Sequence, residues 1–580
     1  MASGNKDINR SRRRFLETIV ASTVAIGAGV IGYEIGKELI KCPPCPKCPQ
    51  IPSNATTTTP TSGVSCSCPP CPAQSIPQGY DYIIFINNGN YYVMNSSGQT
   101  IYQSSDPGSA ISYAINQLGS NGGRVLIRNG VYVCTSYPCV TINNTSSSGT
   151  PGLIIIEGED PTGTIFTVGN GAVSSSGQGL FVISGSYMWL RRVGFNGNAG
   201  NNTYSVGNQF NIAVSSAKFV WIDSIYSTNG PGAVGVLNSS NVIVSNVVSE
   251  GDSIGVYVGG SDTVLIGYSS LRGSGNYGVE VSSSTNTVIY GSSIIDAGNG
   301  VLINDGDVLI DGGTITFPTV SGGYGVNATI STAGREVIIS GTAITGSVAN
   351  AINAAVNTQG TLAIQDSVVM AGSKSTLSVS STPGNGAELV IIGASFRDQV
   401  TTAGSSPYNI NGVDSVAIIN SAFQFGNQTS SANGPSISNA KYLILRGNTI
   451  IGYSTGIGIS SCSSAYLYDN YFAGVTTPVS YSNISLMYAI RNIGWVPTVT
   501  TPSVPSSGSQ VVNTYPVPVT VCLYGGSVSQ ITITKAGQSI IAFQSSTPQS
   551  INGECFLLDP GDSIAINYVQ PPNWAWIPMT

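Results

Sequence analysis

Short apolar runs separated by turn residues recur along most of this chain. A representative run is Val242-Ile-Val-Ser-Asn-Val-Val, and a second short run usually follows a glycine, as in Gly255-Val-Tyr-Val. Alternation of this kind, bounded by Gly, Asn and Ser, predicts strands. Successive main runs start 20 to 29 residues apart, at Val220, Val242, Val264, Val288, Val308, Val337, Leu362, Leu389, Val416, Leu443 and Tyr466.

A period of about 25 residues built only of strands and turns predicts a β-helix. Leucine-rich and helical repeats need helical spacing, and propeller blades need about 40 residues or more. Coils stacked ~4.8 Å apart pair their backbones and bury one continuous column of Val and Ile. In this register Val256 and Val258 point inward and Tyr257 outward, and one coil later Glu280 points outward.

The residues before the repeat predict a cap. Residues 81–86 and 91–94 flank an Asn-Asn-Gly turn and predict a hairpin. Asp106-Pro107 then opens a helix that ends before Gly119, with Ala110, Ile111, Ala114, Ile115 and Leu118 on one face. A strand follows from residue 123 to 133, after which Cys134 and Cys139 are spaced to close a small loop.

The helix followed by Gly-Gly-Arg-Val-Leu-Ile-Arg-Asn-Gly-Val-Tyr, together with the coils from about 150 to 490, resembles the pectin lyase-like, right-handed parallel β-helix superfamily. The resemblance covers roughly 400 residues. It implies an all-β solenoid fold, and it is poorly specific for function because the superfamily includes lyases, hydrolases, tail spikes and adhesins.

After the coils the composition of the chain changes. Residues 491–515 are rich in Pro, Ser and Thr and predict a linker. Residues 516–580 contain alternating runs and predict a small β-sandwich, with Cys522 and Cys555 placed to form a disulfide. Trp574 and Trp576 either stack on sugars or belong to a buried closing strand.

The N-terminus predicts export. Ser11-Arg-Arg-Arg-Phe-Leu followed by an apolar run from Thr18 to Tyr33 resembles a twin-arginine signal, and the alternative is a plain membrane anchor with chance arginines. No clear Ala-x-Ala site follows, and residues 15–40 are long enough to span ~30 Å as a helix. We therefore expect segment 1–40 to remain as an anchor, with the rest outside the cell.

Residues 41–79 predict a stalk. They hold two Cys/Pro clusters, Cys42 to Cys48 and Cys66 to Cys71, around a Thr-rich stretch. Pro-rich chain favours extended polyproline II, and outside the cell cysteines form disulfides by default. The cross-links could join the two clusters, join two chains into a homo-oligomer, or close locally. The expected organisation is thus anchor 1–40, stalk 41–79, cap 80–149, β-helix 150–490, linker 491–515 and terminal domain 516–580.

Composition narrows the function. Of 580 residues 8% are charged, the net charge is −6 and there is no histidine. With 21 Lys+Arg, the chain lacks the charge for a phosphate-binding groove, which argues against nucleic acid as a partner. The missing histidine excludes Ser-His-Asp triads and His-ligated metals. It also departs from the hydrolases of the superfamily, whereas a lyase needs only an Arg or Lys base beside calcium.

One column of charged residues is a candidate site. Counting eight residues from Val242, Val264 and Val288 reaches Glu250, Arg272 and Asp296, with Asp252 nearby. If these stack on consecutive coils, they could bind calcium or transfer a proton, with Glu250, Asp252 and Asp296 as metal ligands and Arg272 as a base. The alternative is a surface ion-pair ladder of little energetic value.

A second candidate site pairs Glu280 with Tyr257 one coil earlier. A carboxylate beside an aromatic ring suits a sugar, although a solvated strand face looks the same in sequence. Sequons such as those at Asn95, Asn144, Asn238 and Asn327 make glycosylation an expectation for an exported chain.

Three functions fit these features. The first is an anchored surface protein that binds glycans or has an adhesive or structural role. The second is a polysaccharide lyase that uses Arg272 with Glu250, Asp252, Asp296 or Glu280. The third is a spike-like assembly subunit. Since few groups titrate between neutral and acidic pH, we also expect acid tolerance.

Overall fold

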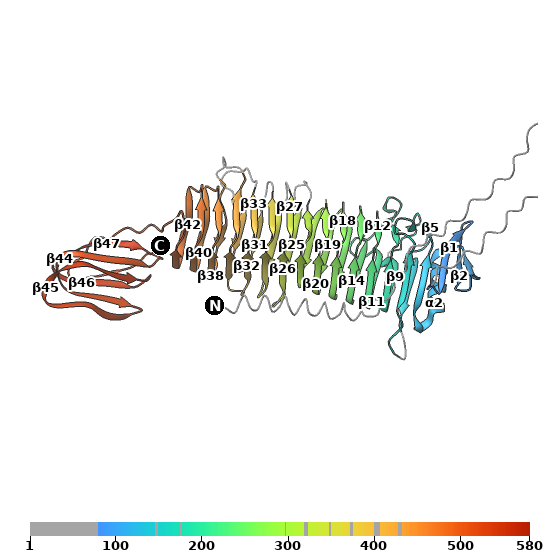
Figure 1. The fold of residues 1–580 in the computed structure, drawn as a ribbon, viewed down its shortest axis with the longest axis horizontal. Coiled ribbons are helices and arrows are strands. Elements are labelled where there is room, and N and C mark those ends of the chain that lie inside the picture. Colours follow the sequence, from blue (N-terminus) through green and yellow to red (C-terminus); the bar gives the residue numbers. More distant parts are fainter. Residues whose placement is uncertain are drawn as a thin grey trace, which may run out of the picture.

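A computed structural model describes residues 79–145, 149–174, 177–295, 297–317, 323–346, 350–371, 375–398, 407–426 and 432–579. They form a long rod of stacked strands with a separate sheet at its C-terminal end (Figure 1). The expected export segment and the Cys-rich stalk lie outside the described residues. Among the residues described, no helix has the length and apolarity to cross a membrane.

The rod is a parallel β-helix whose coils each contribute strands to three rows. The first row contains β6(Val140–Asn144), β13(Val234–Leu237), β16(Ile254–Gly259), β19(Tyr277–Ser282), β22(Asn299–Asn304), β25(Tyr324–Ile330), β28(Asn350–Val356), β31(Leu377–Ser380), β34(Tyr408–Asn411) and β37(Ser436–Ser438). The second contains β4(Gly123–Ile127), β7(Ile154–Gly158), β14(Ser240–Ser245), β17(Asp262–Gly267), β20(Thr285–Tyr290), β23(Val308–Asp311), β26(Glu336–Ser340), β29(Thr361–Gln365), β32(Glu388–Ile392), β35(Ser415–Ile419) and β38(Tyr442–Arg446). Four long strands belong to both rows, namely β9(Gly179–Arg191), β11(Phe210–Asp223), β40(Thr455–Tyr468) and β42(Thr477–Ile490).

The third row is a separate sheet of 14 strands. It contains β5(Gly130–Cys134), β8(Thr164–Val168), β10(Gly194–Asn196), β12(Tyr226–Thr228), β15(Val248–Glu250), β18(Ser270–Arg272), β21(Ser293–Ile295), β24(Thr314–Thr316), β27(Ala343–Gly346), β30(Val368–Ala371), β33(Ser395–Asp398), β36(Ala422–Phe425), β39(Thr449–Ile451) and β41(Tyr471–Ala473). All strand pairs in this row are parallel, as the repeat predicted.

The core is the expected column of apolar side chains. Val256 and Val258 are fully buried, Tyr257 between them faces outward, and Val279 and Val281 repeat the pattern around Glu280. Two of the sequence-based run starts are wrong by one residue. Val264 pairs with Thr287 rather than Val288, and Leu443 pairs with Ala465 rather than Tyr466.

These corrections have a physical cause. A polar Thr287 and a small Ala465 occupy inward positions, and the larger apolar neighbour faces outward. Since successive side chains alternate sides, an error of one residue reverses the face of every side chain counted from it.

Turns between the second and third rows use a left-handed backbone conformation. Glycine or asparagine takes this conformation in several coils, for example Asn246 at φ 52° and Gly291 at φ 55°. Asn and Gly tolerate this conformation better than other residues. The next position in several coils carries a polar side chain that bonds to the neighbouring coil. Near the C-terminal end these are the buried Asn448 and Asn470 and the half-buried Asn492.

The cap consists of β1(Tyr82–Asn87), β2(Asn90–Asn95), β3(Thr100–Ser104) and helix α2(Pro107–Leu118), with short 3₁₀ turns at Gly119–Asn121 and, in a later coil, at Ala199–Asn201. The hairpin and the helix were both predicted. Asp106 caps α2 by accepting a 2.7 Å bond from the Ser109 backbone N–H, and the five expected apolar residues of α2 are buried.

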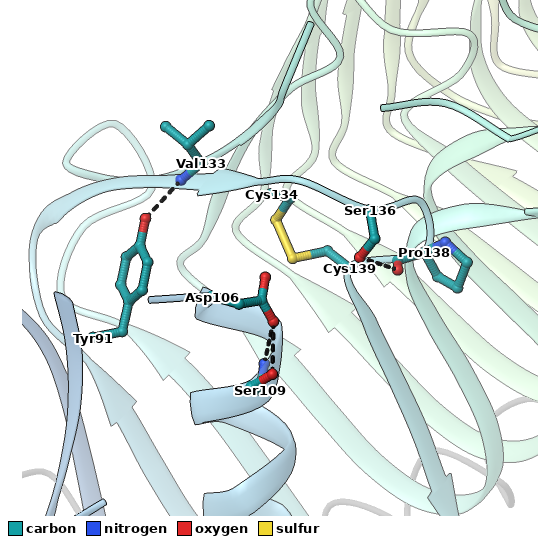
Figure 2. Close-up of a disulfide and its surroundings, with 8 residues drawn as sticks. All are labelled: Tyr91, Asp106, Ser109, Val133, Cys134, Ser136, Pro138 and Cys139. Atoms are coloured by element: carbon teal, nitrogen blue, oxygen red, sulfur yellow. Dashed lines mark hydrogen bonds between the residues drawn. A yellow bond between two sulfur atoms is a disulfide. The ribbon is translucent and has the colours of Figure 1, made fainter. Parts of the chain in front are cut away.

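A disulfide joins Cys134 and Cys139 at the edge of this cap (Figure 2). Beside it, the Val133 N–H donates to the Tyr91 hydroxyl at 3.2 Å, which ties the end of β5 to the hairpin.

The terminal domain is one antiparallel sheet, where the sequence predicted a sandwich. It contains β43(Gln510–Val512), β44(Val519–Lys535), β45(Gln538–Leu558), β46(Ser563–Gln570) and β47(Asn573–Pro578), and a disulfide joins Cys522 to Cys555. No second sheet of described residues covers the buried face of this sheet. Val499, Val504 and Tyr515, from the chain before the sheet, pack against its core instead.

Candidate functional site

The predicted column of Glu250, Arg272 and Asp296 is assembled only in part. Glu250 and Arg272 are neighbours on β15 and β18, both exposed, but no ion pair joins them in the described structure. Glu250 instead accepts a 3.0 Å bond from the Tyr226 hydroxyl, and the Arg272 Nε donates to the Ser270 hydroxyl at 3.0 Å.

The third member of the column was assigned wrongly. Arg272 pairs with Ile295 on the next coil, because that coil is 23 residues long and not 24. Asp296 itself lies outside the described residues. The acid–base–acid ladder on which the lyase alternative depended is therefore absent from the described part of the column.

Asp252 faces the interior and not the solvent beside Glu250. It is fully buried, and its carboxylate accepts bonds from the Gly230 N–H and the Ser249 hydroxyl, both at 2.7 Å. Burial raises the pKa of Asp252 to about 6, against the opposing effect of these bonds and one from Ser227. Because Asp252 and Glu250 point to opposite sides of the wall, they cannot share a calcium ion.

No group of three or more acidic, Cys or His side chains among the described residues is close enough to hold a metal. The calcium site expected from Glu250, Asp252 and Asp296 is thus not formed by the two members that the structure describes.

The second candidate pair lies on neighbouring coils, as the register predicted, on the outer face of the first row. Tyr257 on β16 and Glu280 on β19 are direct neighbours in the parallel register, and both are partly exposed. Leu302 follows on the next coil, and then Asn327 and Asn353, whose side chains are joined by a 2.9 Å bond. A ring, a carboxylate, a leucine side chain and two amides thus follow one another along the rod at ~4.8 Å per coil.

Glycines position the aromatic side of this site. A Cβ at Gly259 would lie 2.6 Å from the Tyr257 ring, and one at Gly235 would lie 2.3 Å from Phe210. Without these side chains the two rings lie close to the sheet, with their centroids 5.6 Å apart. The result is a low aromatic wall at one side of Glu280.

The electrostatics of Glu280 distinguish it from an ordinary surface acid. Burial raises the pKa of its carboxyl above the ordinary value. Burial and the nearby Glu280 charge raise the pKa of the Tyr257 and Tyr277 hydroxyls. A half-buried carboxylate beside a hydroxyl-bearing ring can accept hydrogen bonds from a polyhydroxylated ligand or exchange a proton with it.

Sequence reasoning missed Tyr277, which begins the strand of Glu280 and whose pKa the Glu280 charge helps to raise. It also missed an exposed pair on the next face, Tyr268 and Tyr290, with 63% and 42% exposure and centroids 5.2 Å apart in an edge-to-face arrangement. The 22-residue spacing of this pair, close to one coil, is the signal that could have revealed it.

Trp574 and Trp576 are not free to bind a sugar. They are 7% and 4% exposed in the core of the terminal sheet, and the Trp574 Nε1–H donates to the Pro502 carbonyl at 2.7 Å. The structure thus contradicts the sugar-stacking expectation and agrees with a buried closing strand. Among the sequons, the Asn144 side chain is also buried and bonded to backbone carbonyls, so it cannot carry a glycan in the folded chain.

The chain has distant structural similarity to several proteins of known structure. It resembles the A-module of the Azotobacter vinelandii mannuronan C-5 epimerase AlgE6, with 13% identity over 68% of this chain and 96% of that one and a TM-score of 0.37. A GH87 α-1,3-glucanase catalytic domain matches at 11% identity over 67% of each chain, TM-score 0.34. PfbA, a surface adhesin of Streptococcus pneumoniae, matches at 12% identity over 76% and 95%, TM-score 0.34.

No family model and no curated protein sequence matches the chain. A likeness this distant transfers no activity, so the function has to be argued from the site itself.

Proposed function

We propose that this chain is an exported cell-surface protein that binds polysaccharide along the outer face of its first strand row. The observation that carries the proposal is Glu280, half-buried beside Tyr257 of the preceding coil, with the Asn327–Asn353 amide pair further along the same column. Rings bind the apolar faces of sugars, and carboxylates and amides bind their hydroxyls. A site spread along a column suits a chain-like ligand better than a compact one.

Two features support a location outside the cell. The chain has two disulfides among its described residues, and disulfides persist in oxidising compartments. The twin-arginine-like segment would deliver the chain there, and the apolar segment within 1–40 would hold it to the membrane by way of the Cys-rich stalk. In this arrangement the rod presents its flank to surrounding glycans.

The proposal is tested with a glycan array probed with the full chain, followed by affinity measurements on any polysaccharide that binds. We expect Glu280→Gln and Tyr257→Ala each to weaken binding by about tenfold or more, as central contacts do. Matched controls are Glu388→Gln, an outward acid of the second row, and Tyr471→Ala, an exposed tyrosine at 44%. Equal loss in the controls would contradict the assignment of the site.

The same hits also discriminate binding from catalysis. Incubation of each polysaccharide with the protein, followed by analysis of chain length, should show no cleavage. Cleavage that Glu280→Gln abolishes would make the protein an enzyme at this site, and cleavage that Arg272→Ala abolishes would restore the lyase alternative.

A further inference from the structure

Two long connections of the β-helix lie side by side at its cap end. The chain crosses from the third row to the first over residues 169–178, after β8, and again over residues 197–209, after β10. Further along the rod the same crossing takes only residues 251–253, after β15. Long surface connections on a rigid scaffold commonly carry binding sites. The first coils therefore have chain beyond what their own stacking requires.

Hydrogen bonds fix these two connections to each other and to the wall of the rod. The Gly171 N–H donates to the Asn201 carbonyl at 3.2 Å, and the Asn202 Nδ2 donates to the Gly169 carbonyl at 3.1 Å. The Gly169 N–H donates to the carbonyl of Cys134 at 2.8 Å, next to the disulfide of Figure 2. A Cβ at Gly169 would lie 2.9 Å from that carbonyl oxygen, so the close approach requires glycine.

Residues of both connections, together with the outer side of β5 and β8, line a pocket of about 430 Å³. This volume lies within the roughly 300–1,000 Å³ of typical small-ligand sites. Val133 on β5 and Thr167 on β8 are register neighbours in its wall. The pocket lies near the cap, where Figure 1 shows β5, and therefore on a different row and several coils away from Tyr257 and Glu280.

The lining of this pocket is neutral. None of its residues carries a charge or an aromatic ring. Val133, which is 44% exposed, and Ala172 supply apolar surface. A carboxylate or a phosphate entering here would lose water without gaining an opposite charge, and an aromatic ligand would find no ring to stack on. The lining therefore favours an uncharged, non-aromatic ligand.

Three hydrogen-bonding groups of the lining are available to such a ligand. They are the hydroxyls of Thr135 and Thr167 and the amide nitrogen of Asn170, and no hydrogen bond within the described part of the chain engages them. The Asn170 Oδ1, in contrast, accepts a 2.9 Å bond from the Asn198 Nδ2, which sets the orientation of the amide. Hydroxyls both donate and accept, and an amide nitrogen donates, so the set complements the hydroxyls of a sugar.

We infer that this pocket binds a short, uncharged saccharide, whose hydroxyls bond to Thr135, Thr167 and Asn170 and whose apolar face lies on Val133. Its compact shape suits a short ligand, whereas the column of Glu280 suits a long one. Because hydrogen bonds already hold the two connections in place, little ordering is needed when the ligand binds. The inference does not depend on the glycan site of the first row.

The test titrates the full chain with small saccharides by calorimetry, in a detergent without a sugar head group. The neutral probes are disaccharides of glucose, galactose, mannose and xylose, and digalacturonate is the charged probe. We expect at least one neutral probe to bind with a dissociation constant of about 10 mM or lower. Digalacturonate should bind at least about tenfold more weakly, because the lining offers no counter-charge.

The double variant Thr167→Val, Asn170→Ala should weaken binding of that neutral probe about tenfold or more, because two hydrogen bonds are lost. The matched control is Thr361→Val, Asn573→Ala. It replaces a partly exposed threonine of β29 and an exposed asparagine of β47, both outside the pocket. Glu280→Gln should leave the binding unchanged, since Glu280 lies on another row.

Failure of every neutral probe to bind, or equal binding of digalacturonate, would overturn the inference. So would an equal loss in the control, or a loss in Glu280→Gln that the pocket variant does not share. If the pocket variant fails to fold, hydrogen exchange of the unsubstituted chain decides. The amides of residues 167–172 should then exchange more slowly when the probe is bound, and unchanged exchange there would contradict the inference.

Discussion

At the scale of single residues, the face that a side chain occupies determines its chemistry more than its type does. Glu250 and Asp252 are two positions apart, yet the first is exposed and the second is fully buried with both oxygens bonded. Glu280, on another row, lies between these extremes. Only the half-buried acid combines access to a ligand with a perturbed proton affinity, which is why the site is assigned to it.

Asp252 should make the protein less stable as the pH rises from acid to neutral. Its folded pKa of about 6 lies above the unfolded value near 3.9, so folding favours the protonated form. Its stabilising effect is complete below about pH 4 and is lost as the pH rises through about 6. Chemical denaturation at pH 4 and pH 7 should show this decline, and Asp252→Asn should flatten it. A decline that persists in the variant would assign it to other groups.

Ligand binding should depend on the charge of Glu280. Burial raises its pKa, so as the pH falls the carboxylate protonates earlier than a free one and loses an acceptor for sugar hydroxyls. We expect affinity to fall with decreasing pH, with a midpoint above the ordinary value for glutamate. In Glu280→Gln the affinity should be low at every pH, and an unchanged pH profile in that variant would exclude Glu280 as the titrating group.

At the scale of elements, polar ladders hold the turns in register. Asn470 is fully buried; its Oδ1 accepts from both the Asn448 N–H and the Asn448 Nδ2, and its Nδ2 donates to the Leu445 carbonyl and the Asn492 Oδ1. Such a network satisfies backbone groups that no strand pairs. Each rung depends on the rungs on either side of it.

Asn470→Ala should therefore lower the free energy of unfolding by about 2–4 kcal/mol, because several buried groups lose their partners at once. Asn409→Ala is the control, since Asn409 points to solvent from β34. Urea denaturation of both variants measures the difference. Equal effects would mean that burial of the ladder is not what stabilises the turn.

At the scale of the whole molecule, the two large apolar cores predict two unfolding transitions. One core runs along the β-helix and the other lies within the terminal sheet. The disulfides differ in the chain they close, because Cys522 and Cys555 are 33 residues apart and Cys134 and Cys139 are five apart. A disulfide that closes a longer loop restricts the unfolded chain more.

Calorimetry with and without reductant should show this difference. We expect reduction to lower the transition of the terminal sheet by several degrees and to leave that of the β-helix nearly unchanged. A single transition, or equal shifts of both, would contradict the independence of the two cores.

The rod as a whole should tolerate acid. The acids whose pKa is lowered include Asp469, held by its hydrogen bond with Arg491, and that exposed pair contributes little stability to lose. With no histidine to charge, acid has few ways to unfold the coils. The far-ultraviolet strand signal should persist at pH 3, and its complete loss there would refute the expectation.

Much of the fold could be read from the sequence because its determinants are local. The cap, its hairpin and helix α2 follow from a turn sequence, Asp106 and a stripe of apolar residues. The coils were predicted from short runs of alternating apolar and polar residues that recur at nearly constant spacing. Tyr257 and Glu280 were predicted to be neighbours because the apolar runs of their two coils have the same pattern. Each of these patterns is complete within one or two coils.

Features that depend on contacts between distant segments, such as coil register and side-chain burial, were decided by the tertiary structure alone. The register of a coil is set by how its inward side chains fit the coil before it. In that coil Thr287, not Val288, pairs with Val264, and Ile295 lies opposite Arg272. The burial of Asp252 and the enclosure of Trp574 by residues near Pro502 are likewise absent from any local pattern. Because side chains alternate along a strand, each one faces either the core or the solvent. Only the packing against neighbouring coils determines which of the two it faces.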